Sequence, residues 1–284
     1  MRRTGRGLAL LLVLAALLAL FPAPAAFAAQ EEEEWDFSVL TLDEAVEAFR
    51  KEHRLNESNF AMGWYDTVGG EEWYYNADAW FVAASMYKLP LNMLYADALA
   101  SGELTEKTAL RGRWSVESAM RASMVKSDNN AAVTLLNGLG LKNKESRERM
   151  AAYSGLSPEE LPAAYFTRNS MSPRFMIGTL RALYEGGEKY DVLLDYMKQA
   201  QPGRYFRYGE DWEWEIAHKY GAIAGFRNDC GIVYTPRPFL LVVFLKDVSG
   251  GEKLLGELCR MATAYSLSLG TEEPAEGSLK GETP

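Results

Sequence analysis

The sequence predicts an α/β (α+β) protein with an antiparallel five-stranded sheet, flanking terminal helices and an all-helical subdomain inserted between strands. Three observations predict this class. Strand-like segments occur near both ends of the chain, a mostly helical stretch over about 86–211 separates them, and helical patterns precede and follow the whole. With 48% hydrophobic residues among 284, the chain can bury a large core.

The first expected elements are a helix and a hairpin. Thr41 and Glu44 form a capping-box pattern ahead of apolar residues at helical spacing, which predicts a helix over about 42–54. Residues 59–66 and 72–76 are strand-like and flank a Gly-Gly turn, so they predict a β-hairpin.

The later elements follow from the same patterns. Ser172 before Pro173 is a favourable N-cap with proline at the first helical position. The expected helices of the insert are 86–100, 115–126, 129–139, 144–153 and 173–185. Strands are expected at 214–220, 228–235 and 239–246, followed by a last helix at 252–267.

Both ends of the chain are expected to lie outside the folded domain, which is taken as 41–268. A basic start, the 14-residue apolar run from Leu8 to Phe21 and a small-x-small site ending at Ala28 predict a signal peptide over 1–28. The run is short for a membrane span, although an uncleaved anchor extending through the alanines is the alternative. Residues 29–40 are interpreted as an acidic leader and 270–284 as a disordered tail.

Composition excludes several functions. The net charge of −9 argues against sequence-independent nucleic-acid binding. Two histidines and two cysteines are too few for a Cys-rich zinc site or a disulfide scaffold, so no metal or cofactor is expected. After signal cleavage, a secreted, extracytoplasmic monomer without stable membrane insertion is expected.

Three short motifs suggest chemistry. Ser85 and Lys88 share a helical face where a strand-like segment meets a helix, and free N–H groups at a helix start can stabilise an oxyanion. The same spacing recurs at Ser123 and Lys126 in mid-helix, as chance allows.

The second motif is Ser127-x-Asn129, and the third is Lys219-x-Gly221. Taken alone, the former is explained by a helix N-cap and the latter by an edge-strand lysine before a turn.

In this order the three motifs resemble the signature of class A β-lactamases and penicillin-binding proteins. Similarity extends to the segments 81–90, 126–136 and 225–234, and the resemblance covers about 35–268. The expected helical insert between strands is also that family's layout.

The resemblance implies a role for each matched residue. Ser85 is the nucleophile that becomes acylated, and Lys88 is its proton acceptor. Ser127 relays a proton to the leaving nitrogen. Asn129 orients Lys88 and the substrate amide, and Lys219 supplies positive charge.

The resemblance further implies substrate-binding positions. The N–H groups of Ser85 and Ala222, next to Gly221, would form the oxyanion hole, and Arg227 would face the cleft and hold the substrate carboxylate. Tyr220 departs from the family, because Thr or Ser normally touches that carboxylate.

A second departure concerns hydrolysis of the acyl-enzyme. The family's loop Glu-x-x-Leu-Asn is missing ahead of Ser172. Glu160, or less favourably Glu159, is the possible deacylation base, although Pro162 alters the turn. Acylation is therefore expected to be faster than hydrolysis.

Three functions remain open. The favoured one is a secreted serine hydrolase that opens β-lactam rings through an acyl-enzyme. The alternatives are a D-Ala-D-Ala carboxypeptidase acting on cell-wall peptides, and a non-catalytic binder with the same fold. In each, the partner is a small-molecule β-lactam or a cell-wall peptide.

Other conspicuous residues are expected to be structural. His53 is taken as a surface residue, and His218 as packed, because its side chain should point away from that of Lys219. Cys230 is expected to face the last helix, which carries Cys259. A disulfide is possible there, although two buried thiols are favoured.

Overall fold

The central sheet explains why the last strands are apolar in sequence. The computed structural model describes residues 35–209 and 212–270. β8 (Phe239–Lys246) lies between two other strands, and seven of its eight residues are buried, which is why its sequence is an unbroken apolar run. The strand order is β2-β1-β8-β7-β5, with all pairings antiparallel. The other strands are β1 (Phe60–Asp66), β2 (Glu72–Tyr75), β5 (Glu215–His218), β6 (Gly221–Ile223) and β7 (Phe226–Tyr234).

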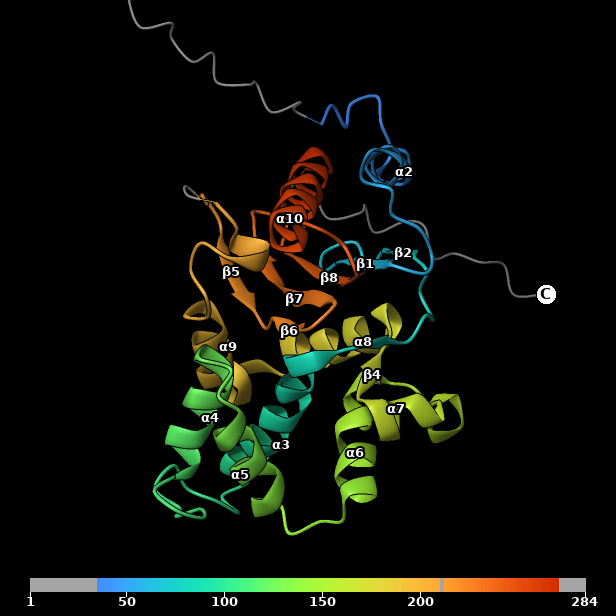
Figure 1. Cartoon of the computed structure of the whole chain (residues 1–284). Helices are drawn as coiled ribbons and strands as arrows, with labels where there is room; N and C mark the ends of the chain where they lie inside the picture. Colours follow the sequence, from blue (N-terminus) through green and yellow to red (C-terminus); the bar gives the residue numbers. More distant parts are fainter. Residues whose placement is uncertain (1–34, 210–211, 271–284) are drawn as a thin grey trace, which may run out of the picture. The chain divides into compact units, whose positions relative to one another are not determined.

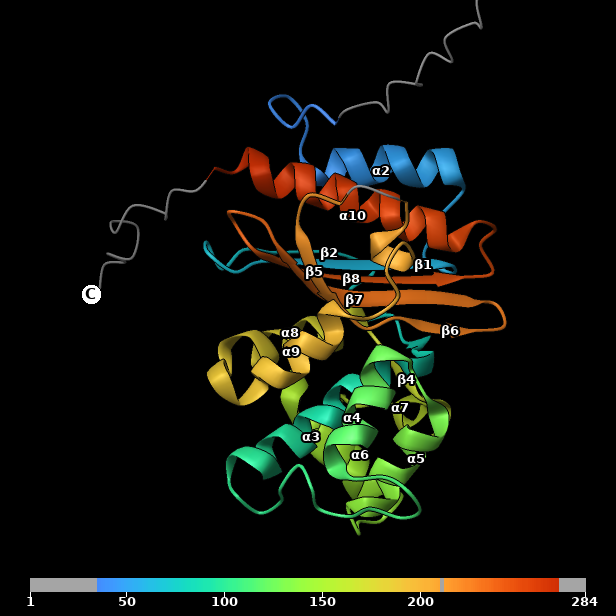
Figure 2. The same cartoon turned by 90° about the vertical axis from the view of Figure 1, so that its left-hand side faces the viewer.

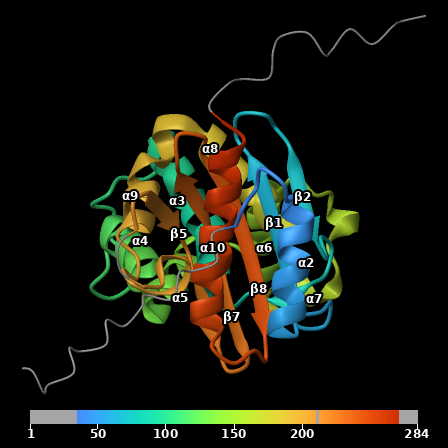
Figure 3. The same ribbon diagram turned by 90° about the horizontal axis from the view of Figure 1, so that it is seen from above.

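Helices cover both faces of this sheet (Figure 2). α2 (Leu42–His53) and α10 (Gly251–Ser268) lie over one face, as the view from above shows (Figure 3). There Trp64 of β1 packs edge-on against Tyr265, with ring centroids 5.0 Å apart. The helical block lies on the other face (Figure 1). The expected fold class is confirmed.

The helices of the block agree with the expected ones to within a few residues at each end. Ser172 caps α8 as expected, because its hydroxyl accepts from Phe175 N at 3.2 Å. The short helices α7 and α9 were not expected. The helices of the block are α3 (Lys88–Ala100), α4 (Val116–Val125), α5 (Asn129–Gly138), α6 (Asn143–Ala151), α7 (Ala163–Arg168), α8 (Pro173–Glu185) and α9 (Asp191–Lys198).

Two details differ from the expectation. β5 and β6 both pair with β7, so five positions across the sheet hold six described strands, with residues 219–220 at the break. The insert is not all-helical, because β3 (Phe81–Val82) pairs with β4 (Ser170–Met171). A two-residue strand gives no alternation that a sequence could reveal.

The structure corrects the expectation that the two cysteines lie on the same side of the sheet. Asn228 of β7 donates to Val82 O at 2.9 Å, on the face toward the helical block. Alternation puts Cys230 on that same face, where it joins the block's core, whereas Cys259 lies on α10 over the opposite face. Both are buried free thiols, so the disulfide is excluded.

The predicted signal peptide at 1–28 and residues 271–284 of the predicted tail lie outside the described residues, as does the leader before Trp35. The leader's last part contacts the fold, since Phe37 packs edge-on against Tyr265 at 5.2 Å. Within the described ranges, none of the helices combines the length and apolar character needed to span a membrane.

Candidate active site

Ser85 lies in a strained turn at the N-terminal end of α3. The 3₁₀ helix Ala84–Tyr87 (η2) leads directly into α3, whose first residue is Lys88. Ala84 has φ of 49°, a left-handed conformation that costs a non-glycine residue energy and is concentrated at functional sites. Ser85 is half-buried, and its hydroxyl forms no hydrogen bond with the described residues. Among the described residues, no hydrogen bond therefore joins Ser85 to Lys88, although their spacing puts the amine within reach of this hydroxyl.

Lys88 is buried and turned toward the second motif. Its Nζ donates to Ser127 O at 2.5 Å, to Asn129 Oδ1 at 2.8 Å and to Ser127 Oγ at 3.2 Å. Burial lowers the pKa of Lys88 to about 8, against the raising influence of the Asp128 carboxylate. A substantial share of the amine is therefore neutral near physiological pH.

Lys219 reaches the same hydroxyl from the sheet. Its Nζ donates to Ser127 Oγ at 3.0 Å and to Tyr220 O at 2.8 Å. Burial and then the charge of Lys88 lower the pKa of Lys219 to about 7. A solvated edge-strand lysine would be exposed, and this one is completely buried. The Ser127 hydroxyl is thus shared by two amines from different parts of the fold.

The turn after α4 explains why Ser127 and Asn129 point inward. The N-cap of α5 is Asp128, whose carboxylate accepts from Ala131 N at 2.8 Å. Asp128, which lies between Ser127 and Asn129, is therefore the capping residue. Helix capping does not explain the other two residues of the motif. Ser127 itself has φ of 54°, which reverses the backbone at this point.

Gly221 allows the third motif to approach the nucleophile. A Cβ at this position would lie 2.3 Å from Ala83 O, which no larger residue could tolerate without a backbone shift. β6 therefore packs against the turn that holds Ser85. This packing brings the strand segment of Ala222 beside η2, as an oxyanion hole shared between them requires.

Tyr220 is held in place by Gln201 and Tyr205, and the sequence did not predict these contacts. Its ring stacks on Tyr205 with centroids 4.3 Å apart, and its hydroxyl accepts from Gln201 Nε2 at 3.1 Å. The Lys219 amine lies 4.1 Å from the ring centroid. Only 9% of Tyr220 is exposed, so its hydroxyl does not stand free in the place of the family's small hydroxyl.

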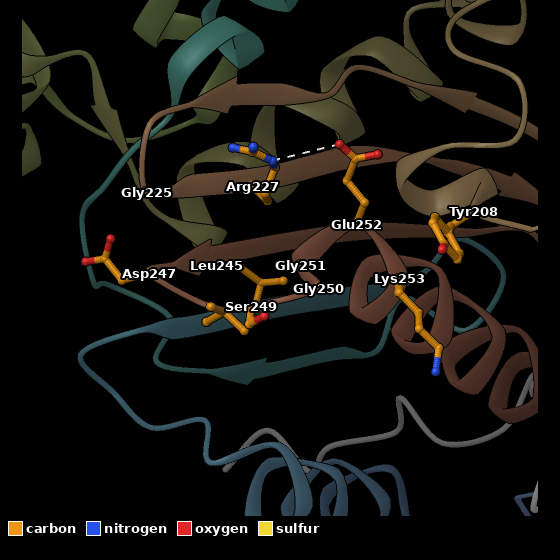
Figure 4. Close-up of a pocket in the computed structure, with 11 residues that line it drawn as sticks. Tyr208, Gly225, Arg227, Leu245, Asp247, Ser249, Gly250, Gly251, Glu252 and Lys253 are labelled. Carbon is orange, nitrogen blue, oxygen red and sulfur yellow. Dashed lines mark ion pairs between the residues drawn. The ribbon is translucent and has the colours of Figure 1, made fainter.

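Arg227 does not face the cleft, which corrects the expectation. Alternation along β7 puts it on the α10 face, where its Cβ lies 3.1 Å from a Cβ placed on Gly251. Its Nη1 donates to Ile223 O and Phe226 O, and its Nε lies 3.8 Å from Glu252 Oε1. Figure 4 shows this ion pair at the edge of a cavity of about 650 Å³. The guanidinium is therefore engaged away from Ser85.

His218 packs, as expected, and takes no direct part in the site. It is completely buried, with Nδ1 2.7 Å from Asp229 Oδ2 and Nε2 2.9 Å from Ala200 O. The same carboxylate accepts from Phe206 N at 3.0 Å. This buried pair ties the loop that carries Tyr205 to the sheet.

Two further candidates have structural roles. Glu160 accepts from Ser157 N at 2.7 Å, and this hydrogen bond lowers the pKa of its carboxyl. Ser123 is buried in α4, where its hydroxyl accepts from Asn92 Nδ2 at 3.1 Å. The repeated spacing at Ser123 therefore belongs to packing between α3 and α4.

Comparisons with known proteins show the family and the fold of this chain. The β-lactamase enzyme family matches residues 42–266, and the chain belongs to that family. Its fold is that of a serine β-lactamase-like hydrolase, which fits a small-molecule substrate. Comparison with curated protein sequences gives no match.

Solved β-lactamase structures share the fold at low identity. The class A β-lactamase of the last common ancestor of Gram-negative bacteria has a TM-score of 0.66 at 20% identity, with 79% of this chain and 99% of that chain covered. A β-lactamase of Xanthomonas campestris gives 0.64 at 20%, covering 81% and 98%. The chromosome-encoded β-lactamase of Vibrio parahaemolyticus gives 0.62 at 20%, covering 78% and 97%.

Proposed function

We propose that this protein is a secreted hydrolase that opens β-lactam rings through an acyl-enzyme on Ser85. One observation carries the proposal: two buried lysine amines with lowered pKa values converge on the hydroxyl of Ser127, beside the strained turn that holds Ser85. Burying two amines is costly, and perturbed groups of this kind gather at catalytic sites.

The geometry supports a reaction in ordered steps. Ser85 Oγ attacks the lactam carbonyl carbon, and its proton passes to the neutral amine of Lys88. The N–H groups of Ser85 and Ala222 bind the resulting oxyanion. When the C–N bond breaks, Ser127 gives its proton to the ring nitrogen and is reprotonated by Lys88 or Lys219. Asn129 holds Lys88 in place through the bond to its Oδ1.

The last step is water attack on the ester, for which Glu160 is the favoured candidate base. Glu160 is occupied at the start of its own turn. The proposal is therefore of ready acylation and slow hydrolysis. A D-Ala-D-Ala carboxypeptidase would use the same residues up to the acyl-enzyme, and the engaged Glu160 is the observation that keeps it as second candidate.

Mass spectrometry after brief exposure to benzylpenicillin tests the proposal. The protein is expected to gain the mass of one penicillin, and Ser85→Ala is expected to abolish this adduct. Ser123→Ala is the matched control, since it removes the same group from the same motif spacing and should still label. An adduct that persists in Ser85→Ala, or no adduct on the unaltered protein, would reject acylation at Ser85.

Turnover separates the two candidates. Steady hydrolysis of a chromogenic cephalosporin, even if slow, indicates a β-lactamase. A long-lived adduct together with release of D-alanine from a peptide ending in D-Ala-D-Ala indicates the carboxypeptidase instead.

A further inference from the structure

The turn that holds Ser85 is joined to the segment that follows α7. β3 leads into this turn and pairs with β4, and the contact continues for one more residue beyond the two strands. There the N–H of Ala83 donates to Asn169 O at 2.9 Å. Asn169 therefore lies beside the start of the turn, next to the strained Ala84.

The side chain of Asn169 reaches across to the turn itself. Its Nδ2 donates to Ala84 O at 2.7 Å. Its backbone ends α7 in a left-handed conformation with φ of 52°, and its own N–H donates to Ala164 O. Asparagine is found at such helix ends, but this cap uses the backbone only. The end of α7 therefore does not account for the hydrogen bond to Ala84.

A neighbouring arginine supports the orientation of this amide. Arg147 Nη1 lies 3.5 Å from Asn169 Oδ1 and donates to Tyr165 O at 3.0 Å. A guanidinium can only donate, so the amide atom that faces Arg147 is the oxygen. The atom that faces Ala84 O is then the nitrogen, which donates. Both neighbours of the amide thus specify the same orientation.

The hydrogen bond to Ala84 O acts on a peptide of the expected oxyanion hole. A peptide unit is planar, so the carbonyl of Ala84 and the N–H of Ser85 turn together as one rigid group. A donor at the oxygen fixes the plane of this group and polarises the N–H at its other end, which becomes a stronger donor. Because Ala84 has φ of 49°, loss of this bond would allow the turn to relax from its strained conformation.

We propose that Asn169 is a positioning residue, which holds the N–H of Ser85 in place for the oxyanion through its hydrogen bond to Ala84 O. Its effect is greatest on the tetrahedral state, because the substrate oxygen gains its negative charge only when Ser85 attacks. The inference rests on the proposed function, which makes Ser85 the nucleophile. It adds a residue from the segment after α7 to a site otherwise built from η2, the start of α5 and the sheet.

Asn169→Asp tests this role, because it keeps the size of the side chain and replaces the donor with an acceptor that repels Ala84 O. Acylation by benzylpenicillin is expected to slow by about 10- to 100-fold. Phenylboronic acid, which forms a reversible tetrahedral adduct with a serine hydroxyl, is expected to bind about tenfold more weakly. Non-covalent binding of benzylpenicillin to Ser85→Ala protein should change by less than about twofold when Asn169→Asp is added. A merely structural role would not separate these three measurements.

Asn76→Asp is the matched control. Asn76 also has a left-handed backbone, with φ of 60°, and its Nδ2 donates to Glu57 O at 2.8 Å, ahead of β1. This variant should be acylated and should bind the boronic acid as the unaltered protein does. Asn169→Gly keeps the left-handed backbone without the amide, so it should reproduce the loss even if Asn169→Asp does not fold.

The outcomes separate this role from the proposed function. Acylation and boronic acid binding that survive both substitutions of Asn169 would overturn the role, as would an equal loss in Asn76→Asp. Benzylpenicillin binding weakened as much as boronic acid binding would also overturn it and assign Asn169 to the general shape of the cleft. An unaltered protein that binds the boronic acid through Asn169 but is not acylated would reject the proposed function and retain the role. An unaltered protein that does neither would reject both.

Discussion

Two lysine amines and one hydroxyl form the centre of the proposed active site. Lys88 and Lys219 donate to Ser127 Oγ at 3.2 and 3.0 Å, and both side chains are fully buried. Like charges this close oppose each other's protonation, so the two amines titrate as a pair. The pair therefore makes a neutral amine available at a pH well below that of an exposed lysine.

Acylation should consequently depend on pH. Because Lys88 must be neutral to accept the Ser85 proton, the acylation rate is expected to rise with pH through about 8 and then level off. Rates of benzylpenicillin labelling between pH 6 and 10 measure this. Lys88→Arg cannot lose its proton in this range and should label at least about 100-fold more slowly. Lys144→Arg, on the exposed part of α6, is the control, and a flat profile would contradict the assignment of Lys88.

Burial of the Lys219 amine should lower the free energy of unfolding of the protein. Its pKa of about 7 in the folded protein lies below the ordinary value, so the unfolded chain binds more protons between about pH 7 and 10. The free energy of unfolding therefore rises with pH in that window. Below it, the destabilisation caused by burying Lys219 has its full size. Lys219→Met is expected to stabilise the protein by about 1–3 kcal/mol at pH 6 and by less at pH 9.5.

Thermal unfolding at the two pH values measures this effect. Lys246→Met, which replaces an exposed lysine at the end of β8, should show no such pH-dependent gain. Destabilisation by Lys219→Met at pH 6 would show that its hydrogen bonds outweigh the cost of burial.

At the scale of elements, the turn from Pro158 to Glu160 bears on the lifetime of the proposed acyl-enzyme. The Glu160 carboxylate bonds to Ser157 N, and its lowered pKa makes it a weaker base. Glu160→Gln is therefore expected to change the lifetime of the penicillin adduct by less than about twofold. Glu159→Gln tests the less favoured candidate in the same way, and Glu145→Gln, which alters an exposed carboxylate on α6, is the control. A lifetime lengthened tenfold or more in Glu160→Gln alone would identify Glu160 as the deacylation base.

The loop of Tyr205 is the second decisive element. His218 and Asp229 tie it to the sheet through Ala200 O and Phe206 N, and it places the Tyr205 ring on Tyr220. Its position depends on a buried pair whose members are 11 residues apart in sequence. No local pattern in the sequence marks such a contact.

At the scale of the whole molecule, export is the open expectation. The basic start, apolar run and Ala28 predict cleavage of residues 1–28, so protein expressed in a secreting host should have the mass of a chain beginning at Ala29. Ala28→Leu removes the small residue that cleavage requires and should leave residues 1–28 attached. Full-length mass for the unaltered exported protein would favour the uncleaved anchor.

The sequence by itself determined the fold class, most helices and strands, and the three motifs around Ser85, Ser127 and Lys219. These depend on short-range periodicity, capping and spacing, which a sequence records directly. Tertiary structure alone decided the direction of Arg227, the faces of the two cysteines and the occupation of Tyr220. Such features depend on strand register and on contacts between distant segments. A shift of one residue in the pairing of a strand turns every side chain to the opposite face of the sheet. Which residues of β7 share a face could therefore be established only in the folded sheet.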